Sequence, residues 1–363
     1  MCVFPVCEHA FVRWDNLKVD AEEARTLPGY REPATVRTFD APEALDTRFY
    51  EVRAKSALNR VPNASRMPFR WTINPYRGCS HGCLYCFARP THTYLDFNAG
   101  RDFEKEIVVK VNVPEVARAE LMRPSWKREH VALGTNTDPY QWVEGRYRLM
   151  PGIWEAMRDS RTPSSVLTKS PLLLRDIELF KQIHEVAGFA ANLSIPTLEE
   201  KAWRASEPHT PHPRKRIEAV AELNRAGIPT GVLIAPLMPG INDSPKQVEE
   251  ILELCGEAGA VNIGGIPLHL RGEVRDIFFE WLRSYRPDLV PRYERLYARG
   301  AYVGKEERER IQALLRPGRG GGGSRAMRRS APAEESPADR DPVTMPPPRE
   351  PRPARQPEQG RLF

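Results

Sequence analysis

The sequence predicts an α/β domain built around a parallel sheet. Short apolar runs rich in β-branched residues alternate with amphipathic stretches of helical period, and the alternation is long enough for six or more strand-helix units. Parallel strands joined by helices form either a doubly wound sheet or a full or partial (β/α) barrel. No GxGxxG segment follows the first strand, which counts against a dinucleotide-binding sheet. In either architecture, functional side chains lie at the carboxyl ends of the strands.

Seven segments are expected to form strands, because each is short, apolar and bounded by turn-forming residues. In chain order they span 70–74, 106–111, 130–135, 165–169, 189–195, 230–235 and 260–264. Five further segments carry an apolar stripe at helical spacing and are expected to form helices, at 114–122, 150–159, 173–186, 214–226 and 245–258. Their order along the chain is the order that βαβ units produce.

Composition divides the chain into three parts. Residues 317–363 are rich in Pro, Gly and Arg without apolar periodicity, so they cannot bury enough surface to offset chain entropy and are expected to be disordered. Residues 65–316 contain the predicted strands and helices and are expected to form one core barrel with C-terminal helices. Residues 1–64 show little periodicity and are expected to form an N-terminal extension, partly ordered, that packs on this core.

The composition also argues against several classes of protein. No long apolar run occurs, and the first residues lack the features of a signal peptide, so a cytoplasmic location without a membrane partner is expected. The 6 Cys among 363 residues are too sparse for a disulfide scaffold, and three of them cluster, which indicates metal ligation in a reducing compartment. The net charge of +6 is too small to indicate nucleic-acid binding by itself.

Three cysteines, Cys79, Cys83 and Cys86, stand in the segment GCSHGCLYCFAR directly after the first predicted strand. Three thiolates in one loop can hold three corners of a [4Fe–4S] cluster and leave one iron open for a chelating small molecule. A tetrahedral zinc site normally takes a fourth Cys or His, so a zinc site that includes His81 or His92 is the alternative.

The other three cysteines have no such context. Cys2 and Cys7 are expected to be incidental. Cys255 lies in the apolar helical pattern ILELCGEAG, which predicts a buried core thiol.

The CxxxCxxC pattern, with the aromatic residue Tyr85 before its last cysteine, resembles the radical S-adenosylmethionine (SAM) superfamily. The segments GTNTDPYQ, LTKSPLLLRD and ANLSIPTLEEKAWRASEPHTPHPRKR, in this order, resemble its branch related to spore photoproduct lyase, and within it uncharacterised actinobacterial proteins of the Rv2578c type. The resemblance covers about residues 65–270 and implies a partial (β/α)6 TIM-like barrel. It also implies an enzyme in which a [4Fe–4S] cluster on the three loop cysteines binds SAM and reductively cleaves it to a 5′-deoxyadenosyl radical. Tyr85 is then expected at the SAM site.

The resemblance further implies which strand ends contact SAM. Thr137, just after the third predicted strand, and Ser194, at the end of the fifth, match hydroxyl residues that contact the SAM head group in the lyase-like family. Lys169 ends an apolar strand, where an ammonium group needs an anionic partner, and the SAM carboxylate would supply one. Glu207 and Arg216 match residues kept in similar sequences, and they either contact SAM or only cap the following helix.

Two further features bear on the substrate, which the sequence does not identify. His269 and Arg271 follow the last predicted strand and are candidates to face the substrate, although a strand-terminal Arg is equally often a surface ion-pair partner. Spore photoproduct lyase uses a cysteine near the end of the third strand as hydrogen-atom donor, whereas this chain reads GTNTDPY there. The resemblance therefore disfavours a thymine-dimer lyase of identical mechanism.

Two partners are expected. The resemblance implies an electron donor, such as a flavodoxin or a ferredoxin, that reduces the cluster. The segment from Gln359 to Phe363 has a Gln followed at short spacing by Leu-Phe, and it resembles the motif by which bacterial repair and replication proteins bind the DNA sliding clamp. This motif supports the alternative hypothesis of a DNA repair lyase-like enzyme recruited through the clamp.

Overall fold

The computed structural model describes residues 19–316, apart from residues 40, 42, 43, 45, 63, 64 and 66. For residues 19–24 the description is limited to the backbone. Residues 1–18 and 317–363 lie outside the described part, so the disorder expected for the C-terminal segment stays a prediction, as do the boundaries of the three expected parts.

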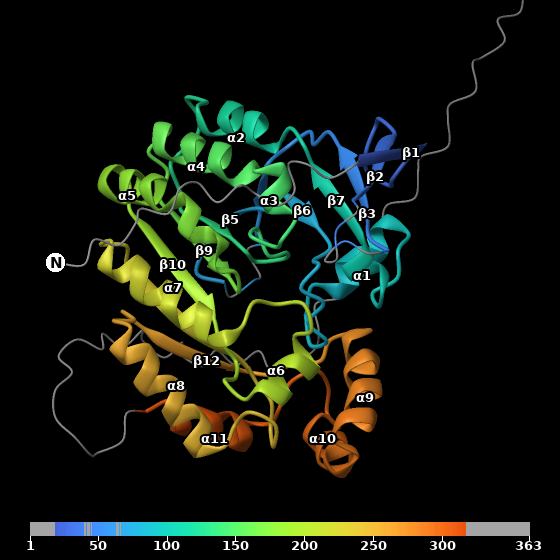
Figure 1. Cartoon of the computed structure of the whole chain (residues 1–363), viewed down its shortest axis with the longest axis vertical. Helices are drawn as coiled ribbons and strands as arrows, with labels where there is room; N and C mark the ends of the chain where they lie inside the picture. Colours follow the sequence, from blue (N-terminus) through green and yellow to red (C-terminus); the bar gives the residue numbers. More distant parts are fainter. Residues whose placement is uncertain are drawn as a thin grey trace, which may run out of the picture. The chain divides into compact units, whose positions relative to one another are not determined.

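Six parallel strands form the central sheet (Figure 1). They lie side by side in chain order, as β5 (Trp71–Ile73), β8 (Val131–Leu133), β9 (Ser164–Thr168), β10 (Phe189–Ser194), β11 (Thr230–Leu237) and β12 (Ile263–Pro267). A doubly wound sheet reverses its strand order internally, whereas strands added in chain order follow the path of a barrel. Within the described residues β12 does not pair with β5, which instead pairs on its other side with antiparallel β4 (Leu58–Arg60), so the barrel stays open. The predicted partial (β/α)6 barrel is confirmed.

Helices between these strands form a layer along the sheet, as Figure 1 shows for α4, α5, α7 and α8. Their bounds, with α2, are α2 (Val113–Leu121), α4 (Leu149–Asp159), α5 (Ile177–Val186), α7 (Pro213–Arg225) and α8 (Pro245–Glu257). All five predicted helices are present, but the one predicted at 173–186 begins with a 3-10 turn, η3 (Pro171–Asp176). The turn starts early because Ser170 Oγ accepts the Leu172 N–H at 3.2 Å and a proline occupies the first helical position.

A second sheet is built largely from the N-terminal part of the chain. Its strands are, in sheet order, β1 (Val19–Arg25), β2 (Ala34–Phe39), β3 (Arg48–Val52), β7 (Glu106–Lys110) and β6 (Tyr76–Arg77). The strand predicted at 106–111 is therefore present as β7, but its predicted place among the barrel strands is wrong, since β7 pairs with β3 and β6. Every residue of β7 is buried, so its apolar run has the same character as a barrel strand and does not reveal its neighbours. Glu106 accepts from the Tyr50 hydroxyl of β3 at 2.7 Å, which adds a side-chain contact to this pairing.

The remaining helices are short or follow the barrel strands. They are α1 (Asp102–Lys105), α3 (Glu144–Tyr147), α6 (Glu200–Ser206), α9 (Val274–Tyr285), α10 (Val290–Leu296) and α11 (Lys305–Leu314), with 3-10 turns η2 (Arg89–Leu95) and η4 (Pro287–Leu289). An apolar cluster joins Leu268, Phe278 of α9 and Tyr293 of α10 to Cys83, so the C-terminal helices pack against the cysteine segment. Cys255 is fully buried in α8, as predicted. Among the described helices, none combines the length and apolar content that a membrane crossing needs.

Candidate functional site

The three cysteines of the GCSHGCLYCFAR segment lie in one loop that follows β6. Cys79 and Cys83 are buried, Cys86 is half-buried, and all three are free thiols. The Cys79 N–H donates to the Phe103 carbonyl of α1 at 2.8 Å, and the Cys86 N–H donates to the Cys83 carbonyl at 3.3 Å. The loop turns back on itself, and the three thiols are close enough to act on one another electrostatically.

A buried arginine fixes the backbone of this loop. Arg89 is 1% exposed and donates to the carbonyls of Gly82 and Cys83, each at 2.9 Å. Its Nη2 also lies 2.6 Å from Glu104 Oε1. Gly82 has a φ of +63°, a left-handed conformation that favours glycine, and a Cβ there would stand 2.7 Å from Glu104 Oε2 and displace that side chain. Arg89 and Gly82 therefore determine the shape of the loop on which the cysteines stand.

The chemistry of the loop fits a metal cluster better than free thiols. Burial raises the pKa of Cys83 well above its ordinary value, and burial with the neighbouring Cys79 raises that of Cys86 to about 11. Since metals bind the thiolate, three buried thiolates need the positive charge of a metal group. No three His, Cys, Asp or Glu side chains in the described part of the chain are arranged around a single-ion site. Three cysteine thiolates complete the protein ligands of a cubane cluster with one open iron, whereas a tetrahedral zinc ion needs a fourth ligand.

The two histidines of the alternative zinc site differ in their surroundings, and only His81 contacts one of the loop cysteines, Cys79, through its side chain. His81 Nδ1 lies 3.3 Å from Asp138 Oδ2, and both side chains are buried. The His92 ring stacks on Phe97 with centroids 5.1 Å apart and meets Phe103 edge-on at 5.6 Å. Burial lowers the pKa of His92 to about 4, so this ring packs as a neutral aromatic group. The surroundings of His92 give the zinc alternative no support, whereas His81 lies against Cys79.

A second group of polar side chains stands at the carboxyl ends of β9 and β10. Lys169, directly after β9, donates from Nζ to Ser194 Oγ at 2.6 Å, and the same Nζ lies 3.2 Å from Glu207 Oε1. Glu207 Oε1 also accepts from the Tyr85 hydroxyl, and Oε2 lies 2.7 Å from Arg216 Nη2. We call these five residues the Glu207 cluster. Three of the four predicted SAM-site residues, Tyr85, Lys169 and Ser194, thus meet around one carboxylate.

The charge of the Glu207 cluster depends on Glu207 being ionised. Its side chain is fully buried, directly after α6. Burial alone would raise the pKa of this carboxyl, but Arg216 and Lys169 lower it to about 2. The cluster therefore holds one carboxylate against two cationic side chains, and it carries an excess of positive charge.

The structure argues against the helix-cap role that the sequence left open for Glu207 and Arg216, while their contact with SAM stays a prediction. The first turn of α7 is capped by His212, whose Nδ1 accepts the Arg214 N–H at 3.2 Å. Arg216 instead reaches back from α7 and donates to the Ser194 carbonyl at 2.9 Å as well as to Glu207. Both side chains therefore belong to the polar cluster at the strand ends rather than to a helix cap.

A further polar link, which the sequence did not reveal, connects the cysteine loop to the end of β9. Asp138 accepts from Thr168 Oγ1 at 2.6 Å, from the Lys169 N–H at 2.8 Å and from the Tyr140 N–H at 2.9 Å, and its Oδ2 lies 3.3 Å from His81 Nδ1. Burial would raise the pKa of Asp138, but His81 and these hydrogen bonds lower it. In the sequence Asp138 precedes Pro139, which indicates only a turn. Apart from the Tyr140 N–H, which belongs to that turn, its partners are distant along the chain, so no local signal could have identified the link.

Thr137, the fourth predicted SAM-site residue, lies against the cysteine loop. Its Oγ1 donates to the Gly78 carbonyl at 2.6 Å, and Gln141 Nε2 donates to the same carbonyl at 3.3 Å. Gln141 Oε1 in turn accepts the Ser80 N–H at 2.9 Å. These two side chains hold the backbone on both sides of Cys79. The contacts of Thr137 do not join it to the Glu207 cluster, and its contact with SAM stays a prediction.

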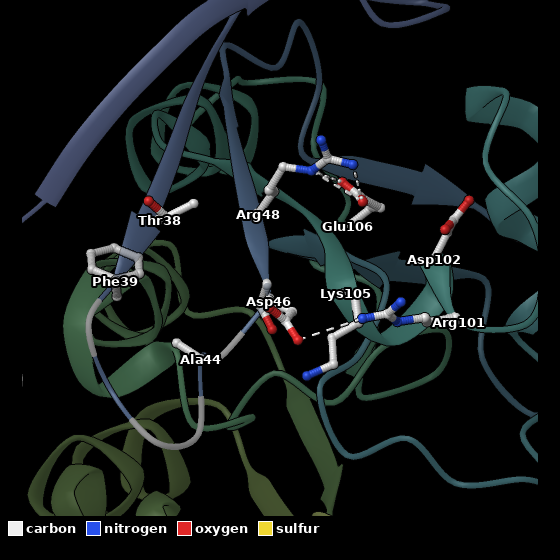
Figure 2. A pocket seen from close by; sticks show the side chains of 10 residues that line it. Thr38, Phe39, Ala44, Asp46, Arg48, Arg101, Asp102, Lys105 and Glu106 are labelled. Carbon is white, nitrogen blue, oxygen red and sulfur yellow. Dashed lines mark hydrogen bonds and ion pairs between the residues drawn. The ribbon is translucent and has the colours of Figure 1, made fainter.

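A pocket of about 530 Å³ lies next to the same helix α1 that contacts the loop, and Figure 2 shows cations and carboxylates around it. Its lining comprises Thr38, Phe39, Ala44, Asp46, Thr47, Arg48, Arg101, Asp102, Lys105 and Glu106. Arg48 pairs with Glu106 at 2.5 Å, and Arg101 with Asp46 at 3.6 Å, as the dashed lines show. None of the predicted site residues lines this pocket, so it adds no side chain to the site.

Comparisons with known proteins agree with the arrangement of the loop and the barrel. The family model described as the radical SAM superfamily matches residues 73–262. Uncharacterized protein Rv2578c of Mycobacterium tuberculosis is 47% identical over 291 residues, which are 80% of this chain and 86% of that protein. Uncharacterized protein MJ0683 of Methanocaldococcus jannaschii is 30% identical over 195 residues, which are 53% of this chain and 69% of that protein.

The fold is similar to solved structures of spore photoproduct lyase. The lyase complexed with dinucleoside spore photoproduct matches with a TM-score of 0.56 and 15% identity, over 81% of this chain and 83% of that chain. At this identity the likeness concerns the fold alone. The family model spans more than half of the sequence, and the mycobacterial relative aligns over most of both chains. The chain belongs to the radical SAM superfamily, as its cysteine loop and strand ends predicted.

Proposed function

We propose that this enzyme holds a [4Fe–4S] cluster on Cys79, Cys83 and Cys86 and binds SAM beside it, for reductive cleavage to a 5′-deoxyadenosyl radical. The observation that carries the proposal is the contact of Tyr85, from the cysteine loop, with the same buried carboxylate that pairs with Lys169. This shared contact with Glu207 brings the ammonium group of Lys169, at the end of β9, close to the three thiols. A zwitterionic ligand of the open iron needs such a group for its own carboxylate.

The proposed roles of the side chains follow from their charges. The bound cluster would supply the electron for SAM cleavage, and the protein would supply orientation and electrostatics. Lys169 and Ser194 offer an ammonium and a hydroxyl to the SAM carboxylate, which is the stronger, charge-assisted kind of hydrogen bond. Glu207 and Arg216 act as positioning residues, because Glu207 holds Lys169 and Tyr85, and Arg216 donates to the Ser194 carbonyl at the end of β10.

The barrel contributes by shielding the reaction. The cysteine loop packs on Leu268 and Leu270 after β12, and these residues join the apolar cluster formed with α9 and α10. An apolar enclosure of this kind excludes water and competing hydrogen donors from a reactive intermediate. The loop and the strand ends are therefore sheltered on the side of the C-terminal helices.

The proposal is tested on protein reconstituted anaerobically with iron and sulfide. We expect about four irons per chain and, with dithionite and SAM, formation of 5′-deoxyadenosine. The Cys83→Ala variant should lose both iron and product, whereas Cys255→Ala, the matched control from the core of α8, should keep both. Wild-type protein that binds one zinc, or product that persists in Cys83→Ala, would contradict the proposal.

A DNA repair lyase-like enzyme is the second candidate, and it rests on the segment from Gln359 to Phe363, which lies outside the described residues. In the described part of the chain, the cysteine that does not belong to the loop is Cys255, which is buried in the core away from the strand ends. A lyase with a cysteine hydrogen donor would thus need Cys2 or Cys7. Clamp binding that is unchanged when 359–363 is deleted would remove the argument for recruitment to DNA.

The one-electron donor is a further part of the proposal. Cleavage of SAM consumes an electron, so a flavodoxin or a ferredoxin is expected to support 5′-deoxyadenosine formation in place of dithionite. Product formation with dithionite but with neither protein would refute this choice of partner.

A further inference from the structure

Three aromatic rings stack on the surface beside the cysteine loop, and we call them the ring ladder: Phe87, His269 and Tyr302. The ring centroids of Phe87 and His269 are 5.7 Å apart, and those of His269 and Tyr302 are also 5.7 Å apart. The planes of Phe87 and His269 are inclined by 37°, a tilted contact, and those of His269 and Tyr302 by 28°, a stacked contact. Phe87 is 53% exposed and Tyr302 is 51% exposed, which leaves both ends of the ladder open to solvent.

Two segments joined by an antiparallel bridge hold His269 and Tyr302, and the first of them packs into the apolar cluster that contains Cys83. Leu268 and Leu270 are buried in the apolar cluster that contains Cys83. Because successive side chains of an extended chain point to opposite faces, the intervening His269 turns outward. Tyr302 forms an antiparallel bridge with His269, which places the two rings in contact. The inner face of these segments thus supports the loop, and the outer face presents the rings.

Arg271 adds a cation at the Tyr302 end of the ladder. Its guanidinium carbon lies 5.1 Å from the Tyr302 ring centroid. Among the described residues Arg271 has no carboxylate partner, so the surface ion pair considered from the sequence is not formed. Burial and the neighbouring Arg271 lower the pKa of His269, and the imidazole therefore stacks as a neutral ring at pH 7.

Open rings beside an uncompensated guanidinium indicate a ligand of definite chemistry. Large apolar side chains in water are costly when they gather, and such exposed patches usually mark a binding site. Aromatic faces stack on the bases of single-stranded nucleic acids, and Arg pairs with phosphate through its planar fork. A base and a phosphate in one ligand would match both features of this surface.

We propose that the ring ladder and Arg271 bind a nucleotide, with its base stacked on an exposed ring and its phosphate paired with the guanidinium. The ladder begins one residue after Cys86 and continues after the carboxyl end of β12, which is the end of the strands where barrel enzymes bind substrates. That this nucleotide is the substrate rests on the function proposed above, whereas its binding does not. An unpaired nucleotide within a strand and a free nucleotide share this chemistry.

The test measures binding of a short labelled single-stranded DNA to the reconstituted full chain by fluorescence anisotropy at fixed salt. Tyr302→Leu should raise the Kd about 5- to 150-fold, the loss expected for one base stack, whereas Tyr302→Phe keeps the ring and should keep the affinity. Arg271→Gln should weaken binding and reduce its dependence on salt. A mononucleotide and an abasic strand are titrated in parallel, and iron content confirms that each variant is folded.

The outcomes distinguish a free nucleotide from a nucleotide within a strand, and both from other roles of the ring ladder. Binding of the mononucleotide alone supports a free nucleotide, and binding of the strand supports an unpaired nucleotide in a polymer. Equal affinities of Tyr302→Leu and Tyr302→Phe, equal binding of the abasic strand, or no binding of either ligand to wild type would overturn the proposal. The proposal would also be overturned if Tyr302→Leu slowed reduction of the protein by a flavodoxin but left nucleotide binding intact. Protein that binds the strand but forms no 5′-deoxyadenosine would refute the proposed function and leave this inference standing.

Discussion

Replacing Glu207 with Gln removes the negative charge of the Glu207 cluster while keeping the size of the side chain. A carboxyl group whose pKa falls from 4.5 to about 2 on folding contributes about 3 kcal/mol to the free energy of unfolding at neutral pH. Removing one partner from a buried ion pair costs about 3–5 kcal/mol, because the remaining charge is left without compensation. Both arguments predict that Glu207→Gln loses about 3 kcal/mol, with Lys169 and Arg216 left as facing cations.

The same contacts fix the pH dependence of this loss. Since the folded pKa lies below the unfolded one, the stabilisation is complete above pH 4.5 and disappears as the pH falls toward 2. The difference between wild type and Glu207→Gln should therefore be about 3 kcal/mol at pH 7 and about half of that at pH 3.

Urea unfolding at the two pH values measures this difference, with Glu200→Gln as the control. Glu200 is 63% exposed in its pair with Arg204 at 2.9 Å, so its replacement should cost at most about 0.5 kcal/mol at either pH. A Glu207→Gln variant that is as stable as Glu200→Gln at pH 7, or whose deficit is the same at both pH values, would refute the reasoning.

Two further predictions concern the ligand and the backbone. Lys169→Met should raise the Kd for SAM about 10- to 100-fold, measured by equilibrium dialysis of the reconstituted protein, because a charge-assisted hydrogen bond is lost. The control variant Lys181→Met, at an exposed lysine, should bind SAM as wild type does. Equal SAM affinities of the two variants would argue against Lys169 as the partner of the SAM carboxylate. Gly134 and Gly188 have similar φ values of +85° and +94°, but a Cβ at Gly134 would stand 1.8 Å from the Leu167 carbonyl oxygen, whereas the space at Gly188 is open. Gly188→Ala should lower the free energy of unfolding by about 1–2 kcal/mol through backbone strain alone, and Gly134→Ala should lower it clearly more. Equal urea midpoints of the two variants would contradict this prediction.

The barrel was predictable because its signals are local. After β5, each parallel strand is followed by an amphipathic helix before the next strand or the C-terminal helices, and the strands lie in the sheet in chain order. The strand β7 is an exception, because its own sequence does not predict the sheet to which it belongs. Its run is as apolar as a barrel strand, yet its partner β3 comes from the N-terminal part of the chain, where periodicity is weak. A strand's burial can be inferred from its own residues, but its neighbours depend on pairings that the run does not encode.

The site divides in the same way. The cysteine spacing and the polar strand ends Lys169 and Ser194 are visible in the sequence, because each stands at the end of an apolar run or in a short motif. Asp138 was missed, since it acts through His81 in the cysteine loop and Thr168 on β9, and both contacts exist only after folding. Long-range hydrogen bonds of this kind leave no periodicity or spacing that a sequence can show.

The arrangement of charges explains why these elements belong together. Lys169 and Arg216 share a single carboxylate, Glu207, so the cluster is short of one negative charge. A buried excess cation is costly, and an anionic group that arrives next to Lys169 relieves this cost. The thiolates of a loaded cysteine loop are such anions, and the carboxylate of an amino-acid ligand is another. Tyr85 connects the loop to Glu207, so binding at either place should favour binding at the other. SAM affinity that is the same with and without iron in the loop would contradict this coupling.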